Sequence, residues 1–74
     1  MGFRERQDEL EARRTALVTR LTSLGAAGQQ HRGYNRALTL LNDTFRKAKL
    51  AQRLAILQAA AWLIGVLEKL TAIT

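Results

Sequence analysis

The chain has 74 residues, enough for one domain, and a chain this short buries too small a share of its surface to be more than marginally stable alone. It has no cysteine and a single histidine, His31, which excludes disulfides and a zinc site as added support. Its net charge is +6, and proline is absent. Good helix formers are abundant and no run alternates strictly, so we expect an all-α single domain that is supported by self-association or by a partner.

The first predicted helix covers residues 4–24. Leu10, Leu17 and Leu24 recur every seven residues and form an apolar stripe along it. Acidic side chains lie mainly in the first half, where the helix dipole favours them. Residues 25–33 contain three glycines and no large apolar side chain, so they are predicted to be a linker.

The second predicted helix covers residues 34–73. Its apolar residues keep spacings of three, four or seven, which indicates one continuous helical face. Only Asn42–Thr44 interrupts the pattern, because these residue types favour helix ends over helix interiors. We predict an antiparallel helical hairpin with a long second helix, or a three-helix bundle if that helix breaks at residues 42–44. The face comprises Ala37, Leu41, Phe45, Ala48, Ala55, Ala59, Trp62, Val66, Leu70 and Ile73.

The two predicted helices differ in length. At a rise of ~1.5 Å per residue the first is ~30 Å long and the second ~60 Å, so the first covers half of the second. The uncovered half includes residues 54–67, in which Gln58 is the only polar side chain. Monomeric soluble proteins rarely expose an apolar patch of that extent. We therefore expect residues 54–73 to be covered by a second copy or another protein, by this chain itself, or by lipid.

We therefore expect the protein to be a binding module that acts by occupancy, that is, by filling a site on its partner, as a regulator, an inhibitor or an assembly adaptor. Trp62 is the only tryptophan, a residue type enriched at binding hot spots. Ala61 and Gly65 have the spacing of small residues that lets two helix backbones approach closely. The predicted partner-binding residues are Leu54, Leu57, Ala61, Trp62, Gly65, Val66 and Leu70.

A basic cluster precedes the apolar segment and comprises Arg46, Lys47, Lys49 and Arg53. On an unbroken helix Arg46, Lys49 and Arg53 share one face, and we expect the cluster to steer the protein toward an acidic partner. The same charges suit two alternatives. One is an inner-membrane-associated protein with residues 54–73 in lipid and the basic stretch at anionic headgroups. The other is a nucleic-acid-binding accessory protein, although no recognisable nucleic-acid-binding motif accompanies the cluster.

No constellation of side chains suggests catalysis. His31 stands in the predicted linker without a neighbouring carboxylate or nucleophile, and the glycines there lack the lysine and hydroxyl of a phosphate-binding loop. We expect a cytoplasmic protein that is not an enzyme and uses no cofactor or metal. Its composition resembles that of small bacterial or phage accessory proteins.

Overall fold

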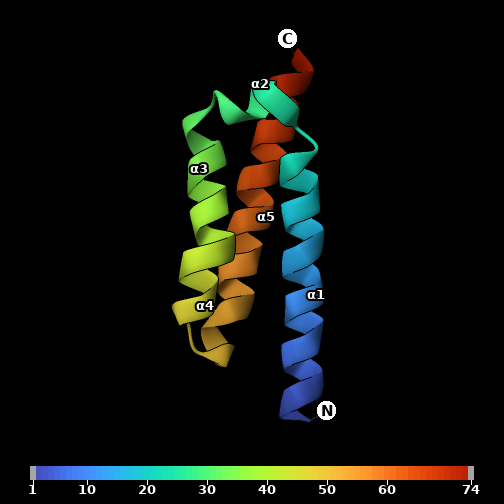
Figure 1. The fold of residues 1–74 in the computed structure, drawn as a ribbon, viewed down its shortest axis with the longest axis vertical. Coiled ribbons are helices and arrows are strands. Elements are labelled where there is room, and N and C mark those ends of the chain that lie inside the picture. The colour runs from blue at the N-terminus through green and yellow to red at the C-terminus, as the bar shows by residue number, and fades with distance from the viewer. Residues whose placement is uncertain (1, 74) are drawn as a thin grey trace.

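The structure is a computed structural model that describes residues 2–73, with Met1, Thr74 and the side chain of Ile73 outside the description. The described part is 90% helical and has no strand, which confirms the all-α prediction. The elements are α1 (Phe3–Thr22), α2 (Gly25–Gln29), α3 (Arg32–Thr39), the π-helical turn η1 (Leu40–Thr44), α4 (Phe45–Lys47) and α5 (Leu50–Ile73). They form three rods that run up, down and up: α1 is the first, α3 to α4 together are the second, and α5 is the third and lies between the other two (Figure 1).

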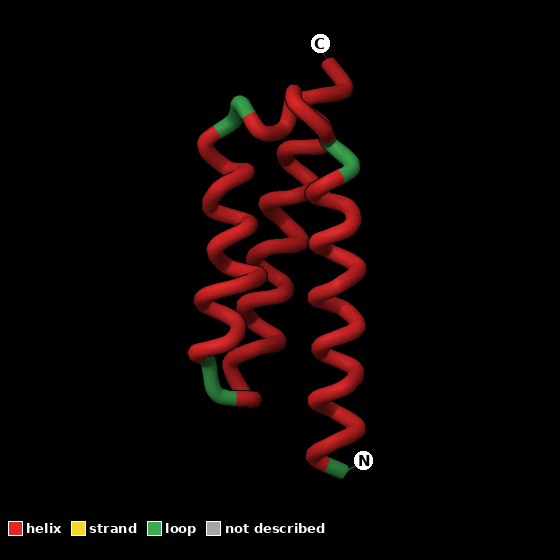
Figure 2. The backbone as a smooth tube through the Cα atoms, in the orientation of Figure 1, coloured by secondary structure: helices red, strands yellow, loops and turns green. Residues whose placement is uncertain are grey.

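The prediction of one unbroken helix over residues 34–73 was wrong. The chain leaves the helix at Ala48, whose backbone is extended (φ −79°, ψ 150°), and turns back before Leu50 (Figure 2). Residues 42–44, where a break was considered, stay helical as part of η1, so α3, η1 and α4 form one rod. The fold is a three-helix bundle in which α5 lies against both other rods, and the predicted overhang of a long second helix does not exist.

The reversal changes which side of the last helix is buried. Before the turn Ala37, Leu41 and Phe45 are buried as predicted, but after it Ala59 and Trp62 are exposed. The predicted continuous face was therefore wrong, because it was extrapolated through the turn. The buried row of α5 instead consists of Leu57, Ala60, Ile64 and Leu67, packed against Leu10, Leu17 and Leu21 of α1 and Tyr34, Ala37, Leu41 and Phe45 of the second rod.

Two local features redirect the chain between the first two rods. Gly25 has a φ of +65°, a left-handed conformation that glycine adopts without strain, and it follows the end of α1. The imidazole of His31 then caps α3, since its Nδ1 accepts a hydrogen bond from the backbone N–H of Gly33 at 3.0 Å. His31, predicted to be a loop residue, thus has a structural role at a helix start.

Arg53 holds the turn between α4 and α5. Its guanidinium lies 4.8 Å from the centroid of the buried Phe45 ring, and its Nε donates a hydrogen bond to the Phe45 carbonyl at 3.1 Å. Arg14 of α1 lies 6.0 Å from the same ring and donates to Asn42 Oδ1 at 3.3 Å. These cation–π contacts and hydrogen bonds join all three rods at one end of the bundle.

An ion pair joins α1 to α5 near the other end. Arg20 Nη2 donates to Glu68 Oε1 at 2.6 Å, and both side chains are more than a third exposed. The hydrogen bond from Arg20 lowers the pKa of Glu68 below its ordinary value, against a smaller opposing effect of desolvation. A carboxylate with a lowered folded-state pKa stabilises the fold above its unfolded pKa, and the stabilisation is lost as the pH falls through the folded value.

We predict that Glu68→Gln lowers the free energy of unfolding at pH 7 by about 0.2–1 kcal/mol, the range for an exposed pair. The difference from the parent should vanish in acid, where Glu68 of the parent is protonated as well. Urea titrations at a series of pH values measure it. Glu9→Gln is the control, because the Glu9–Arg13 pair is longer, at 3.7 Å, and lies within one helix. A difference that persists in strong acid would contradict this assignment.

Candidate docking surface on α5

One face of α5 is packed against the bundle, and the opposite face is open. Successive residues of a helix are 100° apart, so the residues opposite the buried row can be assigned from the sequence. Trp62 lies near the middle of this side and is 70% exposed. We call this side the outward face of α5; its residues, exposed or half-buried, are Ala51, Ala55, Gln58, Ala59, Trp62, Gly65, Val66 and Lys69.

The seven predicted partner-binding residues do not all lie on this face. Trp62, Gly65 and Val66 do, and they form its centre. Three others lie at its edges. Leu54, 40% exposed, and Ala61 line grooves beside α1, while Leu70, 42% exposed, lies beside α2.

The seventh residue, Leu57, is only 3% exposed, so its prediction as a central docking residue was wrong. It belongs to the core because the turn at Ala48 rotates α5 relative to an extrapolated helix. The six remaining residues still mark one side of α5 and its borders.

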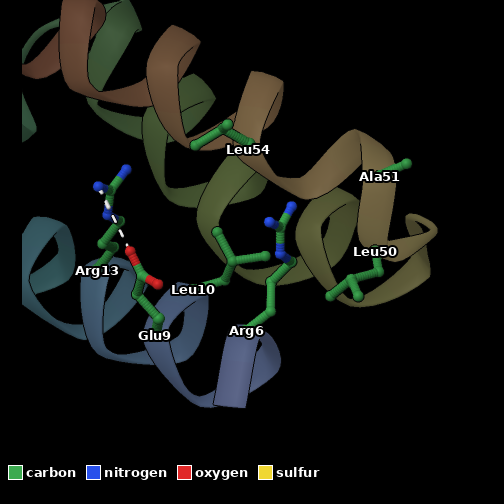
Figure 3. Close-up of a pocket in the computed structure, with 7 residues that line it drawn as sticks. All are labelled: Arg6, Glu9, Leu10, Arg13, Leu50, Ala51 and Leu54. Atoms are coloured by element: carbon green, nitrogen blue, oxygen red, sulfur yellow. Dashed lines mark ion pairs between the residues drawn. The ribbon is translucent and has the colours of Figure 1, made fainter. Parts of the chain in front are cut away.

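A groove between α1 and α5 forms one edge of the outward face. Its larger part, about 500 Å³, is lined by the apolar residues Leu10, Leu50, Ala51 and Leu54 and by charged side chains of α1. Figure 3 shows those side chains, Arg6, Glu9 and Arg13, with the Glu9–Arg13 ion pair. Apolar surface bordered by charged side chains is the usual make-up of a protein interface.

The basic cluster divides into two parts. Arg46, Lys47 and Lys49 are exposed around the turn between α4 and α5. Arg53 is half-buried, and its guanidinium contacts both the ring and the backbone carbonyl of Phe45, so its main role is to hold the turn. The prediction that Arg46, Lys49 and Arg53 share one helix face was wrong, because the chain reverses between them. The exposed part of the cluster lies at one end of α5, beside the outward face.

Gly65 has no packing role within the chain. A Cβ built at this position meets no atom within 4 Å, although glycine in a helix interior costs about 1 kcal/mol relative to alanine. We predict that Gly65→Ala raises the melting temperature of dilute protein by about 4–8 °C, the shift expected for 1 kcal/mol in a domain this small. The same change should weaken docking severalfold, since it adds bulk where a partner approaches.

Circular dichroism melts and binding titrations measure the two effects of Gly65→Ala. Gly25→Ala is the matched control: its φ of +65° strains any side chain, so it should lower the melting temperature. A Gly65→Ala protein that is no more stable than the parent would show that the open space beside Gly65 is filled in solution.

Within the described residues, one helix is long and apolar enough to cross a membrane by length and composition. It covers Leu50–Ala72, and 22% of the most apolar stretch within it is buried. A buried core helix meets the same criteria, so this observation alone does not assign α5 to lipid. The described residues contain no group of three or more His, Cys, Asp or Glu side chains that could hold a metal ion.

Comparison with known proteins provides no relative. The chain matches no family model, no curated protein and no solved structure. The outward face of α5 and the charges around it are therefore the features from which we infer a function.

Proposed function

We propose that this protein is a binding module whose outward α5 face docks on a protein surface and acts by occupancy, as a regulator, an inhibitor or an assembly adaptor. The observation that carries the proposal is the exposure of Trp62, 70%, in the middle of a helix face without charge from residue 54 to residue 67. The other two rods cover one side of α5 and leave this side for another molecule.

The free energy gained by covering Trp62 is large for a small interface. A tryptophan buries 150–250 Å² when fully covered, so the exposed part of Trp62 offers about 140 Å² and, at ~25 cal/mol per Å², on the order of 3 kcal/mol. Its neighbours Ala55 and Ala59 are small, so a partner backbone can come close to the helix. A large anchor among small side chains favours packing against another protein.

Lipid is the second candidate occupant, favoured by the length and hydropathy of α5. The composition of the outward face argues against it, because alanine and glycine gain little from transfer into a bilayer while allowing close helix packing. Lys69 also lies on the face, and Glu68 is paired with Arg20 beside it. Vesicles of anionic phospholipid test this candidate: we expect no change in Trp62 fluorescence on their addition.

Because Arg46, Lys47 and Lys49 are exposed, the direction in which salt changes the binding affinity reports the charge of the occupant. An acidic protein partner or an anionic bilayer is attracted to them, so its binding weakens as salt screens the charges. A partner of net positive charge is repelled, so its binding strengthens with salt. Titrations at low and high ionic strength therefore identify the charge of the occupant before the occupant itself is known.

Photo-crosslinking in the native cell tests the proposal. A benzophenone amino acid replaces Ala59 or Val66 of the outward face, and, as controls, exposed Ala12 of α1 or Asn35 of α3. We expect adducts of defined mass from the two α5 positions, none from the controls, and loss of the adducts when Trp62→Ala is added. Adducts that persist with Trp62→Ala, or that form equally at all four positions, would refute the proposal, as would their absence from α5.

A further inference from the structure

The outward face of α5 carries both a projecting side chain and the small side chains that would receive it. Trp62 projects from the middle of the face, and Ala55 and Ala51 leave shallow, exposed surface two and three turns toward the N-terminus. Helical side chains lean toward the helix N-terminus, so the Trp62 indole lies on the same side of its Cα as these alanines. A surface that holds both halves of a contact is complementary to a rotated copy of itself.

We propose that the occupant of the outward face is a second copy of this chain, with the two α5 helices packed antiparallel about a two-fold axis near Gln58. This inference rests on the proposed function and names its partner. About such an axis, Trp62 of each copy lies against Leu54 and Ala55 of the other, and Gly65 faces Ala51. Each projecting indole then meets one large apolar side chain, Leu54, and the small side chain of Ala55 on its partner.

Gln58 marks the position of the axis. It is exposed and is the only polar side chain in residues 54–67. A primary amide carries both donors and acceptors, so two Gln58 side chains at a two-fold axis can hydrogen-bond to each other. One polar residue within an apolar helix contact commonly sets the register of the pair. If the two-fold axis lay at any other position on the face, the two Gln58 side chains would not face each other.

The charges favour the antiparallel arrangement over the parallel one. Each copy carries a net charge of +6, and Arg46, Lys47 and Lys49 lie at one end of α5. A parallel pair places these two basic ends side by side and sets Trp62 against Trp62. An antiparallel pair holds the two basic ends roughly 25–30 Å apart, beyond the ~8 Å Debye length of physiological salt, and brings only the single charge of Lys69 toward the basic end of the other copy. Because the copies still repel overall, the dimer should tighten as salt rises.

The size of the face predicts a weak dimer. Its eight residues and the edges formed by Leu54, Ala61 and Leu70 are fewer than the roughly 20–30 residues a side of a standard interface. We therefore expect dimerisation that depends on concentration in the micromolar range, so the protein should sediment as a monomer when dilute.

Because the chain has no cysteine, single-cysteine variants of the full chain test the arrangement directly. The variants Ala51→Cys, Gly65→Cys and Gln58→Cys are oxidised by dioxygen with copper phenanthroline, separately and as an equimolar mixture of the first two. We expect Gln58→Cys to form a disulfide dimer alone. Ala51→Cys and Gly65→Cys should link to each other in the mixture and form little dimer alone. Adding Trp62→Ala should reduce each of these yields at least tenfold.

Three results would overturn the inference. Efficient dimers of Ala51→Cys alone would show a parallel pair. Equal linking of Asn35→Cys, at an exposed position of α3, would show random collision. A parent protein that sediments as a monomer up to millimolar concentration would show that no second copy binds. In that last case, photo-crosslinks that survive in the native cell would still support docking on a different protein, so the two proposals fail separately.

Discussion

Replacing Trp62 with alanine is expected to weaken association at least ~30-fold, the effect of removing a hot-spot residue worth 2 kcal/mol or more. In a symmetric dimer each copy loses its Trp62, so this loss of binding free energy occurs twice. The fold should not suffer, because Trp62 is 70% exposed and alanine is the better helix former. Sedimentation velocity over a range of concentrations measures the association, and far-ultraviolet circular dichroism measures the helix content.

Phe3→Ala is the matched control for Trp62→Ala. Phe3 is 68% exposed, almost the same fraction as Trp62, but it lies at the start of α1, away from the outward face. If loss of any exposed aromatic side chain reduces association, then the two variants will behave alike. A Phe3→Ala protein that associates like the parent, beside a Trp62→Ala protein that stays monomeric, supports the assignment. Equal association of all three proteins would refute it.

Phe45→Ala should remove a large part of the protein's stability. The ring is fully buried and is contacted by the guanidinium groups of Arg14 and Arg53, so its removal leaves a cavity and two cations without their aromatic contact. Truncations of this kind cost about 3–5 kcal/mol, and a 74-residue domain has roughly 4–11 kcal/mol of stability in total. Circular dichroism at 25 °C and urea titration measure the loss.

Phe45→Leu separates the cavity from the aromatic contacts. Leucine fills most of the space, so this variant should remain folded, but Arg53 loses the ring beneath it. We expect a cost of about 1–2 kcal/mol, smaller than that of alanine. If Phe45→Ala proves as stable as the parent, the three rods do not meet at this residue and the bundle described above is incorrect.

The helical content was predictable from the sequence, but the chain reversal was not. Glycines mark the first turn, and Gly25 indeed has a positive φ. The second turn, at Ala48 and Lys49, contains two good helix formers and no glycine or proline, so local propensity predicts helix through it. Burial decides instead, because folding back lets Ile64 and Leu67 of α5 reach the core. Such tertiary burial cannot be deduced from a local pattern.

The positions of the proposed docking residues were only partly predictable, for the same reason. The apolar character of residues 54–67 is evident in the sequence, and it identifies the helix that carries the proposed docking surface. Assigning a face requires the phase of the helix, which the turn at Ala48 resets, so Leu57 was predicted for the surface and lies in the core. One signal was present: Leu50, Leu57 and Ile64 recur every seven residues and trace the inner side of α5.

The accessibility of Trp62 to a neutral quencher shows whether the outward face of α5 is open in the monomer and covered on association, since Trp62 is the only tryptophan. Acrylamide quenching is measured on dilute, monomeric protein and again at concentrations where sedimentation shows association. We predict quenching close to that of a free tryptophan amide in the monomer and severalfold protection after association. An indole already protected in the monomer, or one that stays fully accessible in the associated protein, would show that the outward face of α5 is not the docking surface.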